Sequence, residues 1–186
     1  MIGIKLSDGK LRLLTTDMTN TLCIIIDKVA GEDMDITVDA DKFGKLIAKT
    51  TSEDIDLSVK DDVLFVKANG TYKIPLISDE EGLISFPDIK PLGDKNESCS
   101  TKLSSVMQAY NINKSALAKT LENPALTGYY CGDTVISTDA NVITFNGFKM
   151  FDCEEPILIS AQQMQLLTLN TKEDIEVYIG KTGIQF

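Results

Sequence analysis

The chain has 186 residues, a net charge of −10 and 43% apolar residues, enough for one large domain or two small ones. It contains no histidine, which excludes Ser-His-Asp and Cys-His catalysis and histidine metal ligands. No apolar run is long enough to span a bilayer and the first residues do not resemble a signal peptide, so we expect a cytoplasmic protein. In that compartment the four cysteines, Cys23, Cys99, Cys131 and Cys153, are expected to be reduced thiols.

Alternating apolar and polar residues predict β-strands through the first part of the chain. A Ser-Asp-Gly turn between the first two runs indicates a β-hairpin. A stretch broken by Pro and Gly at 88–98 predicts a linker, and the expected domains are 1–92 and 93–186. The expected strands before the linker cover residues 2–6, 10–15, 21–27, 55–59, 63–67 and 71–77.

Helices are expected at three places. Asp39 precedes the first, over about residues 40–50, with Phe43, Leu46 and Ile47 on its apolar face. Ser100 or Thr101 is placed to cap the second, in which Leu103, Val106, Met107 and Tyr110 recur at helical spacing. Ser160 and Gln163 form a capping-box pattern before the third, over about 160–170, and strands at 175–179 and 183–186 follow.

The chain repeats itself once, which predicts domain duplication. Val38, Ala40, Phe43 and Leu46 correspond to Ile159, Ala161, Met164 and Leu167. Glu53–Leu57 correspond to Glu173–Val177, and Leu13–Asp17 to Val135–Asp139. The second copy has a leading helix that the first copy lacks, and the first copy continues past Val66 whereas the second stops at Phe186. From this difference we expect a fragment of a longer protein or a gene with unusual boundaries.

These patterns together resemble the bacterial β sliding clamp, the processivity subunit of the replicative DNA polymerase. The resemblance covers nearly the whole chain and rests on the order of its landmarks. Those landmarks are Leu6-Ser-Asp-Gly-Lys-Leu-Arg-Leu with Thr16-Asp17, Val38-Asp-Ala-Asp-Lys-Phe, Tyr72-Lys-Ile-Pro-Leu with Phe86-Pro, Leu126-Thr-Gly and Ser137-Thr-Asp.

The resemblance implies an α+β fold of duplicated DNA-clamp domains, with helices that line a ring and antiparallel sheets outside. Residues 1–92 would be clamp domain I without its first helix, and residues 93–186 domain II without its last strands. The implied partners are duplex DNA bound without regard to sequence, the replicative polymerase, the clamp loader and, in the full-length form, further copies in a homo-oligomeric ring. The resemblance implies no cofactor, no metal, no membrane and no catalysis.

Five lysines are the expected DNA-facing residues. Lys42, Lys45 and Lys49 fall at i, i+3 and i+7 and so share one face of the first helix. Lys102 and Lys114 bracket the leading helix of the second copy, while Gln162, Gln163 and Gln165 offer uncharged contacts on the last helix. Lysines on an exposed helix face also serve simply for solubility, and both interpretations stay open.

The resemblance also implies a pocket for short partner peptides with apolar anchors. Carried over residue by residue, its members here are Leu126, Thr138, Val142 and Ile143. The family often has Gly-His-Arg where this chain has Ala140-Asn141-Val142, so the rim of the pocket differs. Packing in the core is the alternative role for Leu126 and Ile143.

Two other functional classes compete with the clamp. Asp33 with Asp35, Asp39 with Asp41, and Asp61 with Asp62 could in principle hold a divalent cation for an enzyme, but none has EF-hand spacing and each lies near a turn or a helix start. The chain also lacks both glycine-rich nucleotide-binding motifs. A duplicated α+β scaffold that does not bind DNA is the second alternative.

Overall fold

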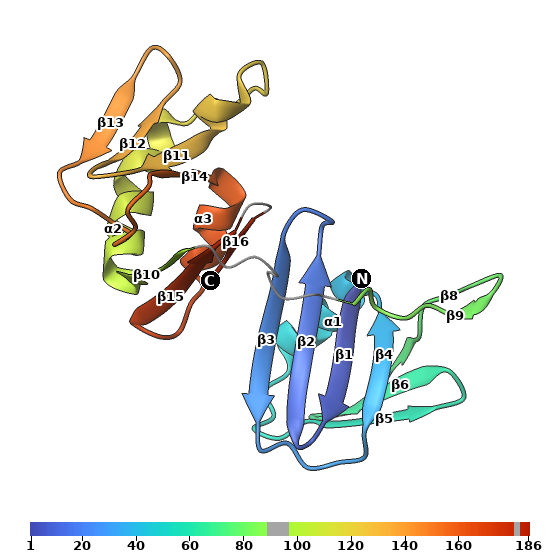
Figure 1. The fold of residues 1–186 in the computed structure, drawn as a ribbon. Coiled ribbons are helices and arrows are strands. Elements are labelled where there is room, and N and C mark those ends of the chain that lie inside the picture. The colour runs from blue at the N-terminus through green and yellow to red at the C-terminus, as the bar shows by residue number, and fades with distance from the viewer. Residues whose placement is uncertain (89–96, 181–182) are drawn as a thin grey trace. The chain divides into compact units, whose positions relative to one another are not determined.

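The computed structural model describes residues 1–88, 97–180 and 183–186 (Figure 1). The chain forms two compact units, Met1–Ile89 and Lys90–Phe186, called unit 1 and unit 2 below. Most of the expected linker lies outside the described residues, and its last residues, Glu97 and Ser98, belong to a strand. Within the described parts of the chain, no helix has the length and apolar character needed to cross a membrane.

Unit 1 begins with an antiparallel four-stranded sheet in the order β3-β2-β1-β4 (Figure 1). Its strands are β1 (Ile2–Ser7), β2 (Lys10–Thr16), β3 (Thr21–Asp27) and β4 (Met34–Val38). Asp8 and Gly9 join β1 to β2 with φ angles of 52° and 69°, the left-handed conformation of a tight hairpin turn. The predicted hairpin is therefore confirmed, whereas β4 was not predicted.

Helix α1 (Ala40–Lys49) follows the sheet and confirms the first predicted helix. The Asp39 carboxylate accepts a hydrogen bond of 2.8 Å from the Lys42 backbone N–H, and so satisfies a donor that the helix leaves open. Phe43 packs in the core of the unit against side chains such as Ile4, Val38 and Leu64. Burying such a side chain contributes about 2 kcal/mol, so α1 is fixed to the sheet through this face.

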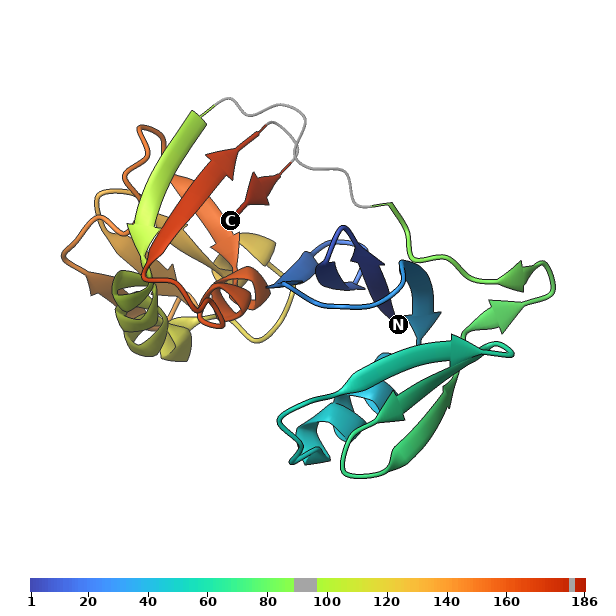
Figure 2. The ribbon, with the colours of Figure 1, turned by 90° about the horizontal axis from the view of Figure 1, so that it is seen from below.

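A second sheet completes unit 1 in the order β5-β6-β7. Its strands are β5 (Asp56–Lys60), β6 (Val63–Lys67) and β7 (Thr71–Pro75), and a short hairpin of β8 (Ser78–Asp79) and β9 (Gly82–Leu83) follows. Leu64, Val66 and Ile74 join Phe43 in the core, and α1 lies alongside this sheet (Figure 2). The three strands predicted here are confirmed, with ends that differ by one or two residues.

Unit 2 repeats this plan with an additional strand and helix in front. The first elements are β10 (Glu97–Lys102), α2 (Leu103–Asn113) and the short 3-10 helices η1 (Lys114–Ala116) and η2 (Pro124–Thr127). The four-stranded sheet, in the order β13-β12-β11-β14, consists of β11 (Gly128–Cys131), β12 (Val135–Thr138), β13 (Ile143–Asn146) and β14 (Ile157–Ser160). Helix α3 (Ala161–Leu167), β15 (Asp174–Ile179) and β16 (Ile184–Gln185) end the unit, and the second sheet has the order β10-β15-β16.

The predicted cap of α2 is wrong, because Ser100 and Thr101 belong to strand β10. The Thr101 hydroxyl donates to the Met150 carbonyl at 2.6 Å and is not available to the helix. Glu173 takes the capping role from elsewhere in the unit: its backbone carbonyl accepts from the Leu103 N–H, and its carboxylate accepts from Ser104. The capping box of α3 is confirmed, with Ser160 and Gln163 exchanging bonds of 3.2 and 3.0 Å.

The predicted duplication is confirmed by the topology. Both four-stranded sheets place the fourth strand beside the first, and a helix follows the fourth strand in each. The turn after the second strand repeats atom for atom: the Thr16 hydroxyl donates to Asn20 O at 3.0 Å, and the Thr138 hydroxyl donates to Val142 O at 2.7 Å. The carboxylates of Asp17 and Asp139 accept the backbone N–H groups of these two turns.

The prediction of four reduced cysteines is wrong. Cys99 in β10 and Cys153 before β14 form a disulfide with a Cα–Cα distance of 5.2 Å, while Cys23 and Cys131 are free. The fold brings the two segments together, since the Asp152 N–H donates to Ser100 O at 3.1 Å. Composition carried no sign of this pairing, because the two cysteines are 54 residues apart.

We predict that reducing this disulfide lowers the free energy of unfolding of unit 2. The closed loop is 54 residues long, and chain entropy gives about 4 kcal/mol for a loop of this length. Thermal unfolding with and without a thiol reductant measures the effect. The Cys99→Ser/Cys153→Ser variant should be insensitive to reductant, and Cys23→Ser should behave like the parent chain. An unchanged midpoint in the parent chain would contradict the prediction.

Candidate functional site

The three lysines of α1 occupy one exposed side of the helix. Lys42, Lys45 and Lys49 are exposed, while Phe43 on another side is buried. Lys45 forms an ion pair of 3.3 Å with Asp41, one turn earlier, and both side chains remain largely in solvent. Because exposed pairs of this kind contribute only about 0.5 kcal/mol, Lys45 remains available to another anion.

The two lysines beside α2 are more strongly engaged. The Lys102 ammonium lies 3.0 Å from the Asp174 carboxylate, whose hydrogen bond and charge raise the pKa of Lys102. Lys114 follows the last residue of α2, donates to Asn111 at 3.2 Å and lies 4.9 Å from the centre of the Tyr110 ring. The structure therefore places both at the ends of α2, as expected, with contacts that partly satisfy each charge.

The helices carry little negative charge compared with the rest of the molecule. Asp41 is the single acidic residue within α1, α2 and α3, although the whole chain has 28 acidic residues. Helices α2 and α3 contain no charged residue at all. Gln162 and Gln165 are exposed on α3, whereas Gln163 is used in the capping box. The acidic residues thus lie almost entirely in the strands and loops.

The four expected pocket residues gather at one end of the first sheet of unit 2. Thr138 and Ile143 face each other across β12 and β13, and Val142 lies in the turn between them. Leu126 lies in η2, which packs against β12, and is half-buried. Val142 and Ile143 are 54% and 64% exposed, so core packing does not account for Ile143.

The apolar surface extends further than the sequence indicated. Tyr130, Ile136 and Phe145 are Cα partners across adjacent strands, and Leu158 continues the row on β14. Side chains two residues apart share a face, so this row lies on the same face as Ile143. Phe145 is 68% exposed. We missed Phe145 and Tyr130 in the sequence; the alternation Ile143-Thr-Phe145 is a short signal for Phe145 alone.

The turn that carries Val142 is held by its own polar groups. Ala140 has a φ of 74°, a left-handed conformation that costs a residue with a Cβ roughly 1 kcal/mol. The Asp139 carboxylate accepts the N–H groups of Val142 and Asn141 at 2.7 and 2.9 Å, and these bonds lower the pKa of Asp139. These bonds therefore hold the turn in shape with alanine at the left-handed position.

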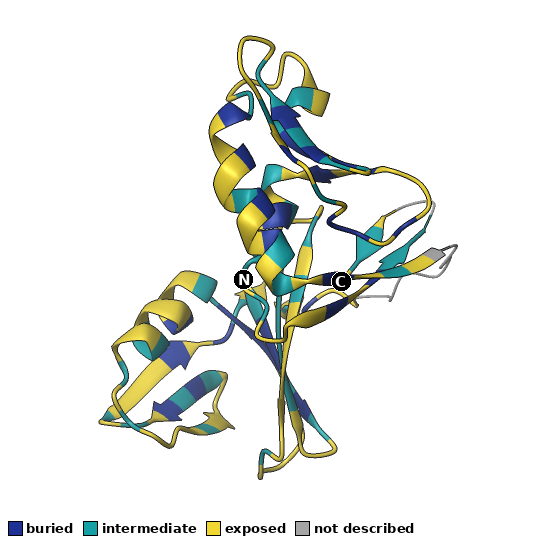
Figure 3. Ribbon diagram, turned by 90° about the vertical axis from the view of Figure 1, so that its left-hand side faces the viewer, coloured by how far each residue is buried: buried dark blue, intermediate teal, exposed yellow. Residues whose placement is uncertain are grey.

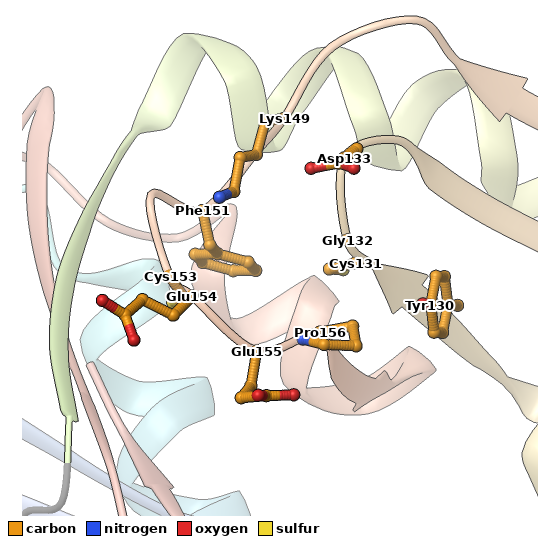
Figure 4. Close-up of a pocket in the computed structure, with 10 residues that line it drawn as sticks. All are labelled: Tyr130, Cys131, Gly132, Asp133, Lys149, Phe151, Cys153, Glu154, Glu155 and Pro156. Carbon is orange, nitrogen blue, oxygen red and sulfur yellow. The ribbon is translucent and has the colours of Figure 1, made fainter.

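A separate shallow pocket of about 110 Å³ lies on unit 2 (Figure 4). Tyr130, Phe151 and Pro156 contribute apolar walls, and Lys149, Glu154 and Glu155 contribute charged groups. None of the four expected pocket residues lines it. Among the described residues, no group of three or more acidic or cysteine side chains is arranged to hold a metal ion.

The architecture defines a fold of two duplicated α+β domains, each with helices packed on antiparallel sheets. Solved β-clamp structures share it. The β subunit of DNA polymerase III from Thermotoga maritima is 16% identical, matches 97% of this chain and 51% of its own length, and has a TM-score of 0.79. The β subunit of DNA polymerase III from Pseudomonas aeruginosa is 20% identical over 98% of this chain and 53% of its own length, with a TM-score of 0.76. The DNA polymerase sliding clamp from Bacillus subtilis is 14% identical, matches 98% of this chain and 52% of its own length, and has a TM-score of 0.76.

These matches confirm the predicted resemblance at the level of the fold, with helices packed on antiparallel sheets. The chain spans about half the length of the solved structures that it matches. No protein-family model matches the sequence, and no curated protein does.

We predict that Asp139 stabilises unit 2 only while its carboxyl group is ionised. Because its folded pKa lies below the unfolded value of about 4, the stabilisation is present above that pH and is lost as the pH falls through the folded pKa. Asp139→Ala should therefore unfold at a lower urea concentration than the parent chain at pH 7. The difference should vanish at strongly acidic pH. Glu122→Ala, which removes another exposed charge of unit 2, is the control, and a difference independent of pH would contradict the prediction.

Proposed function

We propose that this chain is a non-catalytic sliding clamp that encircles duplex DNA and tethers the replicative polymerase and other partners. The observation that carries the proposal is the fold, which β-clamp structures share over 97–98% of this chain. Because the chain spans about half of each clamp, the closed ring is part of the proposal. In it, residues 1–92 act as clamp domain I and residues 93–186 as domain II, and the homo-oligomeric ring is that of the full-length form.

The three helices would face the DNA. A clamp needs weak, sequence-independent attraction to phosphates, since a tight grip would stop it from sliding. Lys42, Lys45 and Lys49 supply three exposed positive charges on α1, and Lys102 and Lys114 add two at the ends of α2. The uncharged helices of unit 2 contribute polar contacts that do not hold the phosphates strongly.

The acidic strands and loops would keep DNA away from the outside. The net charge of −10 repels the phosphate backbone at long range, whereas α1 carries three lysines against one aspartate. This distribution favours DNA at the helices over DNA at the sheets. A clamp loader would open the ring in the cytoplasm, and the process requires neither a metal nor a cofactor bound to this chain.

The exposed end of the first sheet of unit 2 would receive partner peptides. Leu126, Val142 and Ile143 form an apolar rim beside Thr138, and Phe145 extends it. Short peptides commonly dock on such surfaces through two or three apolar anchors. The absence of the family's histidine and arginine from the turn predicts recognition that depends mainly on apolar contacts.

We predict that the variant Lys42→Glu/Lys45→Glu/Lys49→Glu loses most of its affinity for duplex DNA. Each phosphate contact contributes about 0.9 to the slope of log K against log salt concentration, so the slope should fall by up to about 3 units. Fluorescence anisotropy of a labelled duplex at low and moderate salt measures both the affinity and its salt dependence. Lys60→Glu/Lys67→Glu/Lys73→Glu changes the net charge equally on the second sheet of unit 1. Equal losses in the two variants would show a net-charge effect and contradict a helix-based interface.

We also predict saturable binding of a labelled peptide of the Gln-Leu-x-Leu-Phe type to unit 2. Val142→Asp places a charge within the apolar rim and should weaken binding by about tenfold or more. Leu169→Asp, at a position that is 63% exposed beyond α3, is the matched control and should have little effect. Fluorescence polarisation measures the dissociation constant of the peptide for each variant. Unchanged binding to Val142→Asp would contradict a peptide site at Leu126, Thr138, Val142 and Ile143.

A further inference from the structure

The shallow pocket of unit 2 has no role in DNA binding or in the apolar rim proposed for partner peptides. Its volume of about 110 Å³ is well below the roughly 300 Å³ or more of a pocket for a whole small-molecule ligand. It is still several times the share of about 30 Å³ that one water molecule takes in the liquid. The space therefore suits the end of a single side chain.

Two aromatic rings from different parts of unit 2 bound this pocket. Tyr130 belongs to β11 and is exposed, whereas Phe151 belongs to the loop that joins β13 to β14 and is buried. Figure 4 shows the two rings on opposite sides of the space. The face of an aromatic ring attracts a cation that lies within about 6 Å of its centre. The walls thus favour a group that combines positive charge with a flat surface.

The charged groups of the pocket are mainly negative. Asp133, Glu154 and Glu155 contribute three carboxylates, and Lys149 contributes one ammonium. Burial raises the pKa of the Cys131 thiol to about 12, so this thiol is neutral and adds no charge. Within the described residues these carboxylates do not form a metal site. They surround the space and offer an excess of negative charge to an organic cation.

The wall that supplies Phe151 is held in place by contacts outside the pocket. Residues 147–156 form the loop between β13 and β14, and buried residues are interspersed with exposed ones along it (Figure 3). Three consecutive residues of β10 hold this loop through the Cys99–Cys153 disulfide, the bond from the Asp152 N–H to the Ser100 carbonyl and the bond from the Thr101 hydroxyl to the Met150 carbonyl. A wall that is already ordered loses little conformational entropy when a ligand enters. The pocket is therefore preformed.

We propose that this pocket binds the guanidinium group of an arginine side chain from a partner polypeptide. A guanidinium is planar, stacks on aromatic faces and pairs with a carboxylate through two parallel hydrogen bonds, whereas a lysine ammonium is a compact, strongly hydrated charge. Tyr130 also belongs to the exposed row that includes Phe145, so the pocket adjoins the surface proposed for partner peptides. The inference rests on the proposed function in placing the arginine beside the apolar anchors of such a peptide. Binding in the pocket itself does not depend on that placement.

N-acetyl-arginine amide is the probe for the pocket alone, and N-acetyl-citrulline amide, which has a similar shape without the charge, is its control. We expect the arginine probe to shift the backbone amide NMR signals of Gly132, Asp133 and Glu155 in the isotope-labelled full chain. The shifts should saturate with a dissociation constant of about 1–10 mM at low salt. Equal shifts with the citrulline probe would overturn the proposal, as would shifts that do not saturate.

Variants of the chain test the charge of the pocket. Glu155→Lys should weaken binding of the arginine probe by about tenfold or more, because it replaces an attraction by a repulsion. Lys149→Ala removes the pocket's own cation and should strengthen binding by about twofold or more. Glu122→Lys, which makes the same change of charge outside the pocket, should have less than about a twofold effect. All three positions are exposed, so each variant should unfold near the parent's midpoint. Equal effects of Glu122→Lys and Glu155→Lys, or weaker binding after Lys149→Ala, would contradict the proposal.

Extended peptides test the placement of the arginine. An arginine is joined through two glycines to either end of the Gln-Leu-x-Leu-Phe peptide, and citrulline replaces it in the controls. One of the two arginine peptides should bind about fivefold or more tighter than its control, and Glu155→Lys should abolish the gain. No gain with either peptide would contradict the placement beside the apolar anchors.

Val142→Asp separates this inference from the proposed function. It should weaken binding of the unextended peptide and leave binding of the arginine probe unchanged. Binding of the probe without any binding of the unextended peptide would contradict the proposed peptide site and support the pocket. Binding of the peptide without any binding of the probe would overturn the pocket and leave the peptide site.

Discussion

The packing of a helix on the inner face of each four-stranded sheet is the interaction on which the rest of the structure depends. Phe43 of α1 and Met164 of α3 occupy equivalent places in the duplication and are buried in their respective cores. Burying one such side chain contributes about 2 kcal/mol, enough to fix the rotation of a short helix about its axis. Once Phe43 is buried, Lys42, Lys45 and Lys49 must face solvent together.

The same constraint explains why the two faces of the first sheet of unit 2 have different chemical character. Helices α2 and α3 cover the face of its first sheet that carries Tyr129, Val135 and Ile159. The opposite face is free, and there Ile143 and Phe145 remain exposed. A single sheet thus supplies an apolar surface for partners on one side and a platform for uncharged helices on the other. The Asp139 turn sets the end of that apolar surface.

Local patterns in the sequence predicted most of the fold. The hairpin at Asp8 and Gly9, the Asp39 cap and the capping box of Ser160 each depend on residues within a few positions, and each was confirmed. The prediction of the α2 cap was wrong because Glu173, about 70 positions later, replaces the expected Ser100 or Thr101. The disulfide was missed for the same reason, since pairing over such a separation follows from the folded topology and not from local pattern.

The residues of the candidate site were predictable where helical spacing or the internal repeat determines their positions. The common face of the α1 lysines follows from a spacing of three and four residues. The exposed row through Tyr130 and Phe145 was missed because strands β11 and β13 have four residues each, too few for alternation to stand out.

Topological retention on DNA tests the central claim most directly. The chain would be assembled with a clamp loader and ATP on a nicked circular plasmid, washed at high salt, and then compared before and after the plasmid is cut once. A clamp should remain on the circle, because screening removes its weak phosphate contacts but not the ring, and should leave once the DNA is linear. Equal loss from circular and linear DNA would contradict the account.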